Sequence, residues 1–251
     1  GLLRDGYARK DVVVAHPNYI EKFIGPETEV VGTYEMDPLG MGPVTMTFTF
    51  GRKQTSYDEY YNAELHRRIN AAKKKNGSHA KVIAGASGTW QYNYAPEKID
   101  EYGLYAVLEG EMGGIAPEID GHAGRFFDYL IDGKFENMDP FQKRRDFKVD
   151  IKEFKRGDKT MHGRFVNFWD RPELDEIPEI VEPSMHGMVE VMRGCGRGCK
   201  FCDVTLRSLR YYPPEKVQKE IEVNIKKTGL DRAWLHSDDI FVYGMDIRTA
   251  K

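Results

Sequence analysis

The chain has 251 residues, with 37 Lys and Arg against 40 Asp and Glu, a formal net charge of −3 and a pI near 6.2. This length can form one large domain or two modest ones. The charge balance lacks the basic footprint of a nucleic-acid-binding protein, so we expect no nucleic-acid partner. No apolar run approaches the roughly 20 residues of a transmembrane helix, and no signal-peptide pattern begins the chain. We therefore expect no transmembrane segment. The few cysteines, odd in number, favour a reducing cytoplasm as the location.

The first half alternates strand-like and helix-like segments. Five segments have the composition of strands, namely 12–15, 30–33, 44–50, 81–84 and 105–108. Ser56 and Glu59 form a capping box that begins a helix ending at Gly77, and an amphipathic helix is expected at 121–131. This order predicts an α/β fold with a Rossmann-like open parallel sheet, in which ligands bind beyond the carboxyl ends of the strands.

Small residues directly follow the strand-like segment 81–84, at Gly85, Ser87 and Gly88. Small side chains in this position let a cofactor approach the backbone. An ordinary tight turn explains the same residues equally well, because glycine commonly marks turns.

Residues 134–183 are rich in charge and carry prolines at 140, 172, 178 and 183. Proline interrupts helices and central strands, so we expect no long regular element here. We interpret 134–185 as an interdomain connector. Its aromatic residues Phe165, Phe168 and Trp169 are expected to pack as core contacts rather than to form a binding surface.

All the cysteines of the chain follow a strand-like run at 188–192, at positions Cys195, Cys199 and Cys202. Three thiolates with this spacing can bind one face of an iron–sulfur cluster. Without a fourth cysteine, one iron would remain open to a ligand that is not protein. Glycines at 194, 196 and 198 would allow the backbone to fold tightly around an inorganic core.

Two other interpretations of these cysteines are open. A structural zinc site would need a fourth side chain, which His186 or His236 could supply. The thiols could also be incidental. An odd number of cysteines argues against a disulfide framework.

The segment after the cysteines completes a βαβ unit. Pro213, Pro214 and Glu215 are typical of a helix start, and Gly229 stands where that helix would end. A short buried strand is expected at 233–235, followed by Asp238 and Asp239. Sites of β/α barrels lie at the carboxyl ends of such strands, although two solvated loop aspartates are an open alternative.

The cysteine string, with Phe201 directly before Cys202, resembles the signature of the radical S-adenosylmethionine (radical SAM) enzymes, C-x3-C-x-aromatic-C. That signature lies in the loop after the first strand of a β/α barrel. The resemblance implies that the three cysteines hold a 4Fe–4S cluster whose open iron is chelated by SAM. Reductive cleavage of SAM then yields a 5′-deoxyadenosyl radical that abstracts hydrogen.

The resemblance also implies roles for three other residues. The backbone near Phe201 would contact adenine, and Asp238 or Asp239 would bind the amino group of SAM. The two aspartates do not spell the Gly-Gly-Glu form common in that family. An external electron donor such as flavodoxin or ferredoxin is implied as a partner.

An open α/β domain before such a loop is similar to the cobalamin-binding branch of the radical SAM superfamily. The stretches that end at Trp90 and Glu111 are similar to segments of that branch. This similarity implies cofactor contacts from the following residues: Gly85, Ser87, Gly88, Glu109, Gly110 and Glu111. The Asp-x-His-x-x-Gly motif that supplies a cobalt ligand in some members is absent, and His16 is a weak substitute.

Members of that branch methylate unactivated carbon or rearrange carbon skeletons, so a small-molecule or lipid-like substrate is implied, of unidentified structure. Two alternatives remain. The N-terminal domain could lack cobalamin and serve as a substrate or partner platform, or the protein could be a non-catalytic zinc-binding module.

The expected organisation is a cobalamin-binding-like domain at 1–133, the connector at 134–185, and the first βαβ unit of a radical SAM barrel at 186–251. A full barrel takes about 250 residues. We also expect the first strand of the open sheet to be missing from the sequence. We therefore expect the chain to be an interior fragment of a longer polypeptide, inactive by itself.

Overall fold

The computed structural model describes residues 2–3, 6–110, 122–133, 147–168, 174, 177, 179–200 and 209–244. The chain divides into two compact units. The first comprises residues 1–112 with 117–171, and the second comprises 113–116 with 172–251. No helix among the described residues is both long and apolar enough to cross a membrane.

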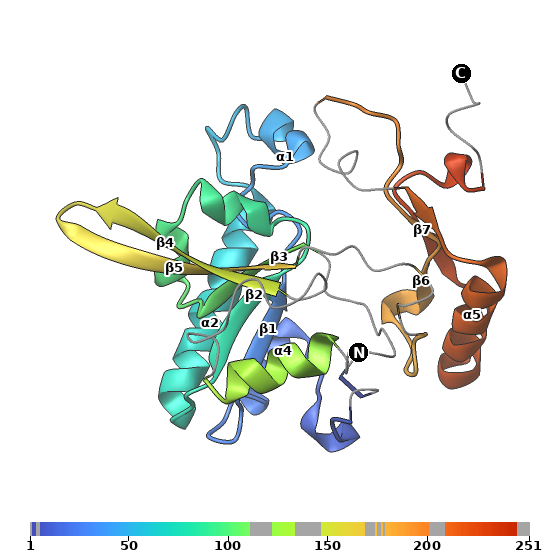
Figure 1. The fold of residues 1–251 in the computed structure, drawn as a ribbon, viewed down its shortest axis with the longest axis horizontal. Helices are drawn as coiled ribbons and strands as arrows, with labels where there is room; N and C mark the ends of the chain where they lie inside the picture. The colour runs from blue at the N-terminus through green and yellow to red at the C-terminus, as the bar shows by residue number, and fades with distance from the viewer. Residues whose placement is uncertain are drawn as a thin grey trace. The chain divides into compact units, whose positions relative to one another are not determined.

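The first unit contains a five-stranded sheet in the order β1-β2-β3-β5-β4 (Figure 1). Its strands are β1 (Val30–Tyr34), β2 (Lys81–Gly85), β3 (Ala106–Gly110), β4 (Phe147–Arg156) and β5 (Lys159–Phe168). All neighbouring pairs are parallel except β4 and β5, which are antiparallel. The predicted Rossmann-like open α/β sheet is confirmed.

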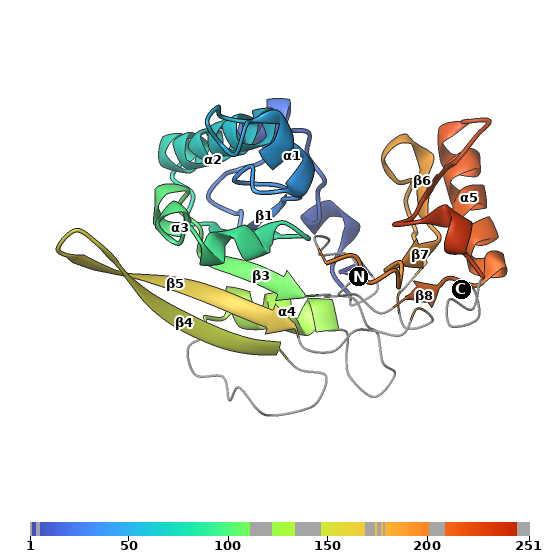
Figure 2. The same ribbon diagram turned by 90° about the horizontal axis from the view of Figure 1, so that it is seen from above.

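Helices cover both faces of this sheet (Figure 2). One face packs against α2 (Tyr57–Asn76) and α3 (Glu97–Glu101), and the other packs against α4 (His122–Ile131). Successive residues of β2 alternate between the two cores, with Val82 and Ala84 in the first and Ile83 in the second. This two-sided burial explains the continuous apolar run that predicts the strand.

Helix α2 begins and ends where its capping residues predict. The Ser56 Oγ accepts a hydrogen bond from the Glu59 amide at 3.1 Å, and Gly77 ends the helix with a φ of +65°. The predicted helix at 121–131 is confirmed as α4.

Two predicted strands of the first unit are wrong. Residues 12–15 lie between two short 3-10 helices, Arg9–Asp11 and Pro17–Lys22, and Val14 is 96% exposed. Residues 44–50 lie mostly in helix α1 (Pro43–Phe48), which has proline in its first turn. The hydroxyls of Thr47 and Thr49 donate to carbonyls four residues earlier, so these side chains satisfy helical backbone rather than alternate across a sheet.

The expectation of no long element within 134–183 is also wrong. Strands β4 and β5 have ten residues each and pair along their whole length. The prolines of this segment flank the hairpin and none lies inside it, so the ladder stays intact. Phe165 is fully buried in the core, as predicted. The side chain of Phe168 and the whole of Trp169 lie outside the described residues.

The second unit contains the predicted βαβ unit. Strand β6 (Met188–Glu190) pairs in parallel with β9 (Trp234–His236), and α5 (Pro214–Thr228) connects them, ending at Gly229 with a φ of +70°. The predicted burial of this last strand is wrong, because Trp234 is 65% exposed and Leu235 is 54% exposed. Within the described part of the chain, β9 pairs with β6 alone.

Polar side chains of α5 hold the segment that leads into β6. The Asn224 Oδ1 accepts a hydrogen bond from the Ser184 amide at 2.8 Å, and the Glu220 Oε1 accepts one from the Ile180 amide at 3.3 Å. Burial raises the pKa of Glu220. The start of β6 is thereby fixed against the helix that follows the cysteines.

A buried carboxylate joins three elements at the end of β1. Glu35 is 3% exposed and accepts hydrogen bonds from the Thr33 hydroxyl at 2.6 Å and the Tyr92 hydroxyl at 2.5 Å. The Nε2 of His66, on α2, lies 2.7 Å from Glu35 Oε1. Burial and the Glu35 charge raise the pKa of Tyr92, so its hydroxyl remains a donor.

We predict that Tyr92→Phe lowers the free energy of unfolding by about 1–3 kcal/mol, because a buried carboxylate oxygen then loses its donor. Urea denaturation would measure the change. Tyr94→Phe is the matched control, since Tyr94 is 75% exposed, and should stay within about 0.5 kcal/mol of the parent. Equal stability of the two variants would contradict the structural role of the Tyr92 hydroxyl.

Candidate functional site

The cysteine loop, residues 194–202, is held at its base in the second unit. Strand β7 (Met192–Arg193) leads into the loop, and β8 (Arg210–Tyr211) pairs antiparallel with β7 after the chain returns. Cys195 is buried, Cys199 is half-buried, and neither forms a disulfide. Phe201 and Cys202 lie outside the described residues.

Three glycines of the loop adopt left-handed backbone conformations. The φ angles of Gly194, Gly196 and Gly198 are +72°, +66° and +73°. L-residues with side chains rarely adopt such angles, which explains the glycine at every second position. Glycines in this conformation let the backbone fold tightly around an inorganic core. The thiol donors and the loop conformation therefore fit a cluster with cysteine ligands.

Both predicted aspartates contact the cysteine loop. The Asp238 Oδ2 accepts a hydrogen bond from the Gly194 amide at 2.7 Å. The Asp239 Oδ2 accepts one from Arg197 Nε at 2.5 Å, and its Oδ1 accepts one from the Phe241 amide at 3.2 Å. The structure thus brings Asp238, Asp239, Cys195 and Cys199 to one end of the βαβ unit.

The parallel pairing of β6 and β9 explains this convergence. Glu190 is opposite His236 in the register, and the Val191 amide donates to the His236 carbonyl at 2.9 Å. The two strands therefore end at the same level, so the segments that follow them meet at one edge.

Sequence reasoning missed the polar residues that support the loop. Glu190 accepts two hydrogen bonds from Arg193, at 2.7 and 2.9 Å, and one from the Tyr212 hydroxyl at 2.9 Å. Burial raises the pKa of Tyr212 above its ordinary value. The side chain of Arg197 was missed as well, although a charged residue between two cysteines with ligand spacing was a usable signal.

Among the described residues, the structure offers no histidine as the fourth ligand that a zinc site would need. Among them, no three His, Cys, Asp or Glu side chains form a group that could hold a metal ion. The structure therefore does not join His186 or His236 to Cys195 and Cys199 as a ligand set. His236 is instead a strand residue whose carbonyl pairs with Val191.

The other predicted site residues lie in the first unit, at the carboxyl ends of β2 and β3. Thr89 links the two ends, because its hydroxyl donates to the Leu108 carbonyl at 2.8 Å and the Ala86 carbonyl at 2.9 Å. The carboxylate of Glu109 accepts a hydrogen bond from Asn93. Gly85, Ser87, Gly88, Glu109 and Gly110 thus share one edge of the sheet, and Glu111 lies outside the described residues.

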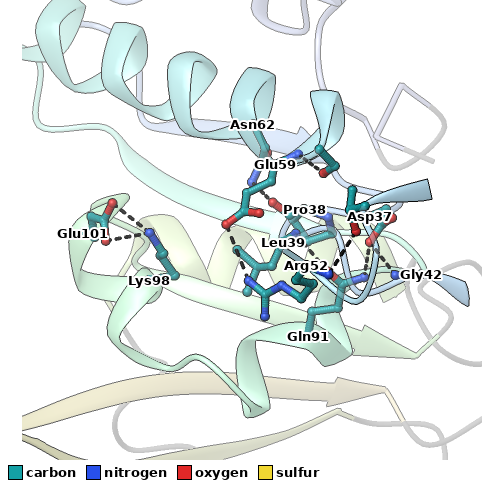
Figure 3. A network of polar contacts seen from close by, with 12 residues as sticks. Asp37, Pro38, Leu39, Gly42, Arg52, Glu59, Asn62, Gln91, Lys98 and Glu101 are labelled. Carbon is teal, nitrogen blue, oxygen red and sulfur yellow. Dashed lines mark hydrogen bonds and ion pairs between the residues drawn. The ribbon is translucent and has the colours of Figure 1, made fainter. Parts of the chain in front are cut away.

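The loop after β1 borders the same edge (Figure 3). Asp37 accepts hydrogen bonds from the Gly42 amide at 2.9 Å and the Gln91 side chain at 2.6 Å. Gln91 in turn accepts one from the Leu39 amide at 2.8 Å. These contacts hold the loop against the segment that follows β2, so this edge is built from fixed backbone.

Gly88 is explained by contact within the protein. A Cβ at this position would lie 2.2 Å from the Met36 carbonyl oxygen and 2.6 Å from Pro38 Cδ. The Gly88 amide also donates to the Glu35 carbonyl at 3.0 Å. Close packing of two loops therefore requires this glycine, whether or not a cofactor approaches it.

The weak candidate His16 has a local role. Its Nδ1 accepts a hydrogen bond from the Asn18 amide at 3.1 Å and caps the 3-10 helix Pro17–Lys22. The structure thus gives His16 a capping contact of the kind common in loops.

Comparisons with known proteins find partial relatives. A probable threonylcarbamoyladenosine tRNA methylthiotransferase of Pyrococcus horikoshii is 30% identical over 98 residues, covering 38% of this chain and 22% of that protein. The ribosomal protein uS12 methylthiotransferase RimO of Chlorobium limicola is 30% identical over 79 residues, covering 31% and 18%. RimO of Thermodesulfovibrio yellowstonii is 34% identical over 73 residues, covering 27% and 16%.

These similarities span about a fifth of the length of the curated relatives. No family model and no solved structure matches the chain. Methylthiotransferases of these kinds are radical SAM enzymes, so the chain is distantly similar, over part of its length, to that superfamily. This agrees with the resemblance carried by the cysteine string. The similarity gives no support for cobalamin use or for a specific reaction.

We predict that Gly88→Ala lowers the free energy of unfolding by roughly 1–3 kcal/mol or more, because the new methyl group meets backbone rather than a movable side chain. Gly85→Ala is the matched control. Its Cβ would have neighbours no closer than 3.8 Å, so it should change stability by less than about 1 kcal/mol. Thermal unfolding of both variants tests the assignment, and a Gly88→Ala protein as stable as Gly85→Ala would contradict it.

Proposed function

We propose that this chain belongs to a radical SAM enzyme in which Cys195, Cys199 and Cys202 bind a 4Fe–4S cluster. The observation that carries the proposal is the placement of the cysteine loop at the carboxyl end of a parallel βαβ unit, with two aspartates at the same end. The left-handed glycines and the partial similarity to radical SAM methylthiotransferases support it.

A bound cluster would supply the electron that cleaves SAM to a 5′-deoxyadenosyl radical. The residues of the chain would bind and orient SAM. Both carboxylate oxygens of Asp239 already accept hydrogen bonds, whereas Asp238 uses Oδ2 for the Gly194 amide. We therefore assign the amino group of SAM to the Oδ1 of Asp238, and adenine to the backbone near Phe201.

The first unit would carry a corrinoid at the carboxyl edge of its sheet. Open α/β sheets bind ligands beyond this edge. Gly85, Ser87 and Glu109 border it, and the contacts of Asp37 and Glu35 hold its loops in place. The hydrogen-bonded Glu109 carboxylate would offer a fixed acceptor to amide groups of the cofactor. Glu111 would act from the same edge.

The reaction would be methylation or rearrangement of a small-molecule or lipid-like substrate, with flavodoxin or ferredoxin as electron donor. A second candidate is transfer of a methylthio group, which the names of the relatives favour. Those names assign tRNA and a ribosomal protein as substrates to the relatives alone. Residues 1–133 would form the cofactor domain, and 186–251 would begin the radical SAM barrel.

We predict that anaerobic reconstitution gives a coloured protein with about four iron and four sulfide per chain. Dithionite should produce a paramagnetic signal that changes on addition of SAM, because SAM would bind the open iron. Cys199→Ser should lose most of the iron and sulfide, since one thiolate ligand is removed. Thr228→Ser, on α5, is the control and should keep them. A colourless protein with about one zinc per chain and no sulfide would contradict the proposal and favour the zinc module.

We predict that titration with cobalamin changes the visible spectrum of the cofactor, because the protein would replace solvent around the corrinoid. Ser87→Trp should weaken this binding about tenfold, equivalent to roughly 1.4 kcal/mol, by filling the edge of the sheet. Glu101→Trp, at an exposed end of α3, is the control. Absence of any spectral change in the parent protein would favour the platform without cobalamin.

A further inference from the structure

Arg197 stands between two cysteines of the loop and reaches out of the loop to Asp239. Its Nε lies 2.5 Å from Asp239 Oδ2. The side chain of Arg197 is 54% exposed, whereas that of Asp239 is 17% exposed. The ion pair with Asp239 raises the pKa of Arg197. Along the loop, Arg197 stands two residues from Cys195 and two from Cys199.

Asp239 has an anchor that does not depend on Arg197. Its Oδ1 caps the short helix Ile240–Val242 through the Phe241 amide. Val242 of that helix is buried against Val191 and Met192, directly before the cysteine loop. The Tyr211 hydroxyl also donates to the Val242 carbonyl at 2.8 Å. Asp239 is thus anchored to the hydrophobic cluster that also contains the residues directly before the cysteine loop.

We propose that Asp239 is a positioning residue that holds the Arg197 guanidinium beside the cysteines, and that this guanidinium raises the reduction potential of the cluster bound there. The inference rests on the proposed function, because it requires a cluster in the loop. The external donor adds one electron to the cluster, no bond forms or breaks, and the cluster becomes more negative. A nearby positive charge stabilises that more negative form.

The pair would also help the loop to retain its cluster. Arg197 lies in the middle of the loop and pairs with the fixed carboxylate of Asp239. This contact limits the conformations that the loop can adopt before and after the cluster binds. Because the pair is partly exposed, its direct contribution to folding stability should be small. Its effect should therefore show in the properties of the cluster rather than in the unfolding of the protein.

The test measures the midpoint potential of the reconstituted cluster by a dithionite titration followed by electron paramagnetic resonance. We expect Arg197→Gln to shift the potential to more negative values, and Arg197→Lys to restore most of the shift because it keeps the charge. Arg232→Gln is the matched control. The Arg232→Gln variant loses the same charge. In the parent protein, Arg232 pairs with Asp231 at the opposite end of β9, and both side chains are more than three-quarters exposed.

A second measurement follows loss of the cluster to an iron chelator. We expect Asp239→Asn to lose iron several-fold faster than the parent, because Arg197 is no longer held by a charge. Asn should still accept the Phe241 amide, so the short helix should persist.

The outcomes separate this inference from the proposed function. If the parent protein binds no cluster, the proposed function fails. If the parent binds a cluster but Arg197→Gln and Arg232→Gln have equal potentials, the role of Arg197 is overturned and the proposed function stands. If Asp239→Asn loses iron at the rate of the parent, the positioning role of Asp239 is overturned.

Discussion

The parallel pairing of β6 with β9 is the constraint on which the candidate metal centre depends. It places the ends of two strands at one level, although more than 40 residues separate Gly194 from Asp238 along the chain. The Asp238 carboxylate then accepts a hydrogen bond from the first amide of the cysteine loop. One carboxylate thereby fixes the point at which the loop leaves the strands, and the left-handed glycines set its course from there. Without this register, the acidic and sulfur-bearing segments would have no common location.

In the first unit, too, a carboxylate joins segments that are distant along the chain, and this carboxylate is buried. Glu35 lies at the end of β1 with almost no exposure. It accepts hydrogen bonds from the Thr33 and Tyr92 hydroxyls and lies within hydrogen-bond distance of His66 Nε2, so its partners come from three elements. A buried carboxylate with fewer donors would be costly. The strand end, α2 and the segment after β2 are therefore held to one geometry. This network lies beneath the edge at which open sheets bind their ligands.

The sequence predicted elements whose signals are local, and failed where the deciding contacts are distant. Helix α2 was predictable because Ser56 and Gly77 cap it through neighbours in the chain. The threonines of 44–50 imitate the alternation of a strand, yet their hydroxyls bond to helical carbonyls. The hairpin of β4 and β5 was missed because its alternating charges resemble a solvated connector, and only pairing with β3 makes it part of the sheet. In the candidate site, the cysteines were predicted from their spacing, and the aspartates from their position after a strand and from the family resemblance. Their mutual contacts depend on strand register and could not be read from spacing.

The close approach of Gly88 to Met36 ties two loops that are far apart along the chain. Any homologue with a side chain at position 88 must reroute the segment at 36–38 to make room for it. These two stretches should therefore covary across an alignment. Insertions at 36–38 should coincide with loss of the glycine at 88. This covariation would identify the sheet edge in homologues whose other segments have diverged too far to align.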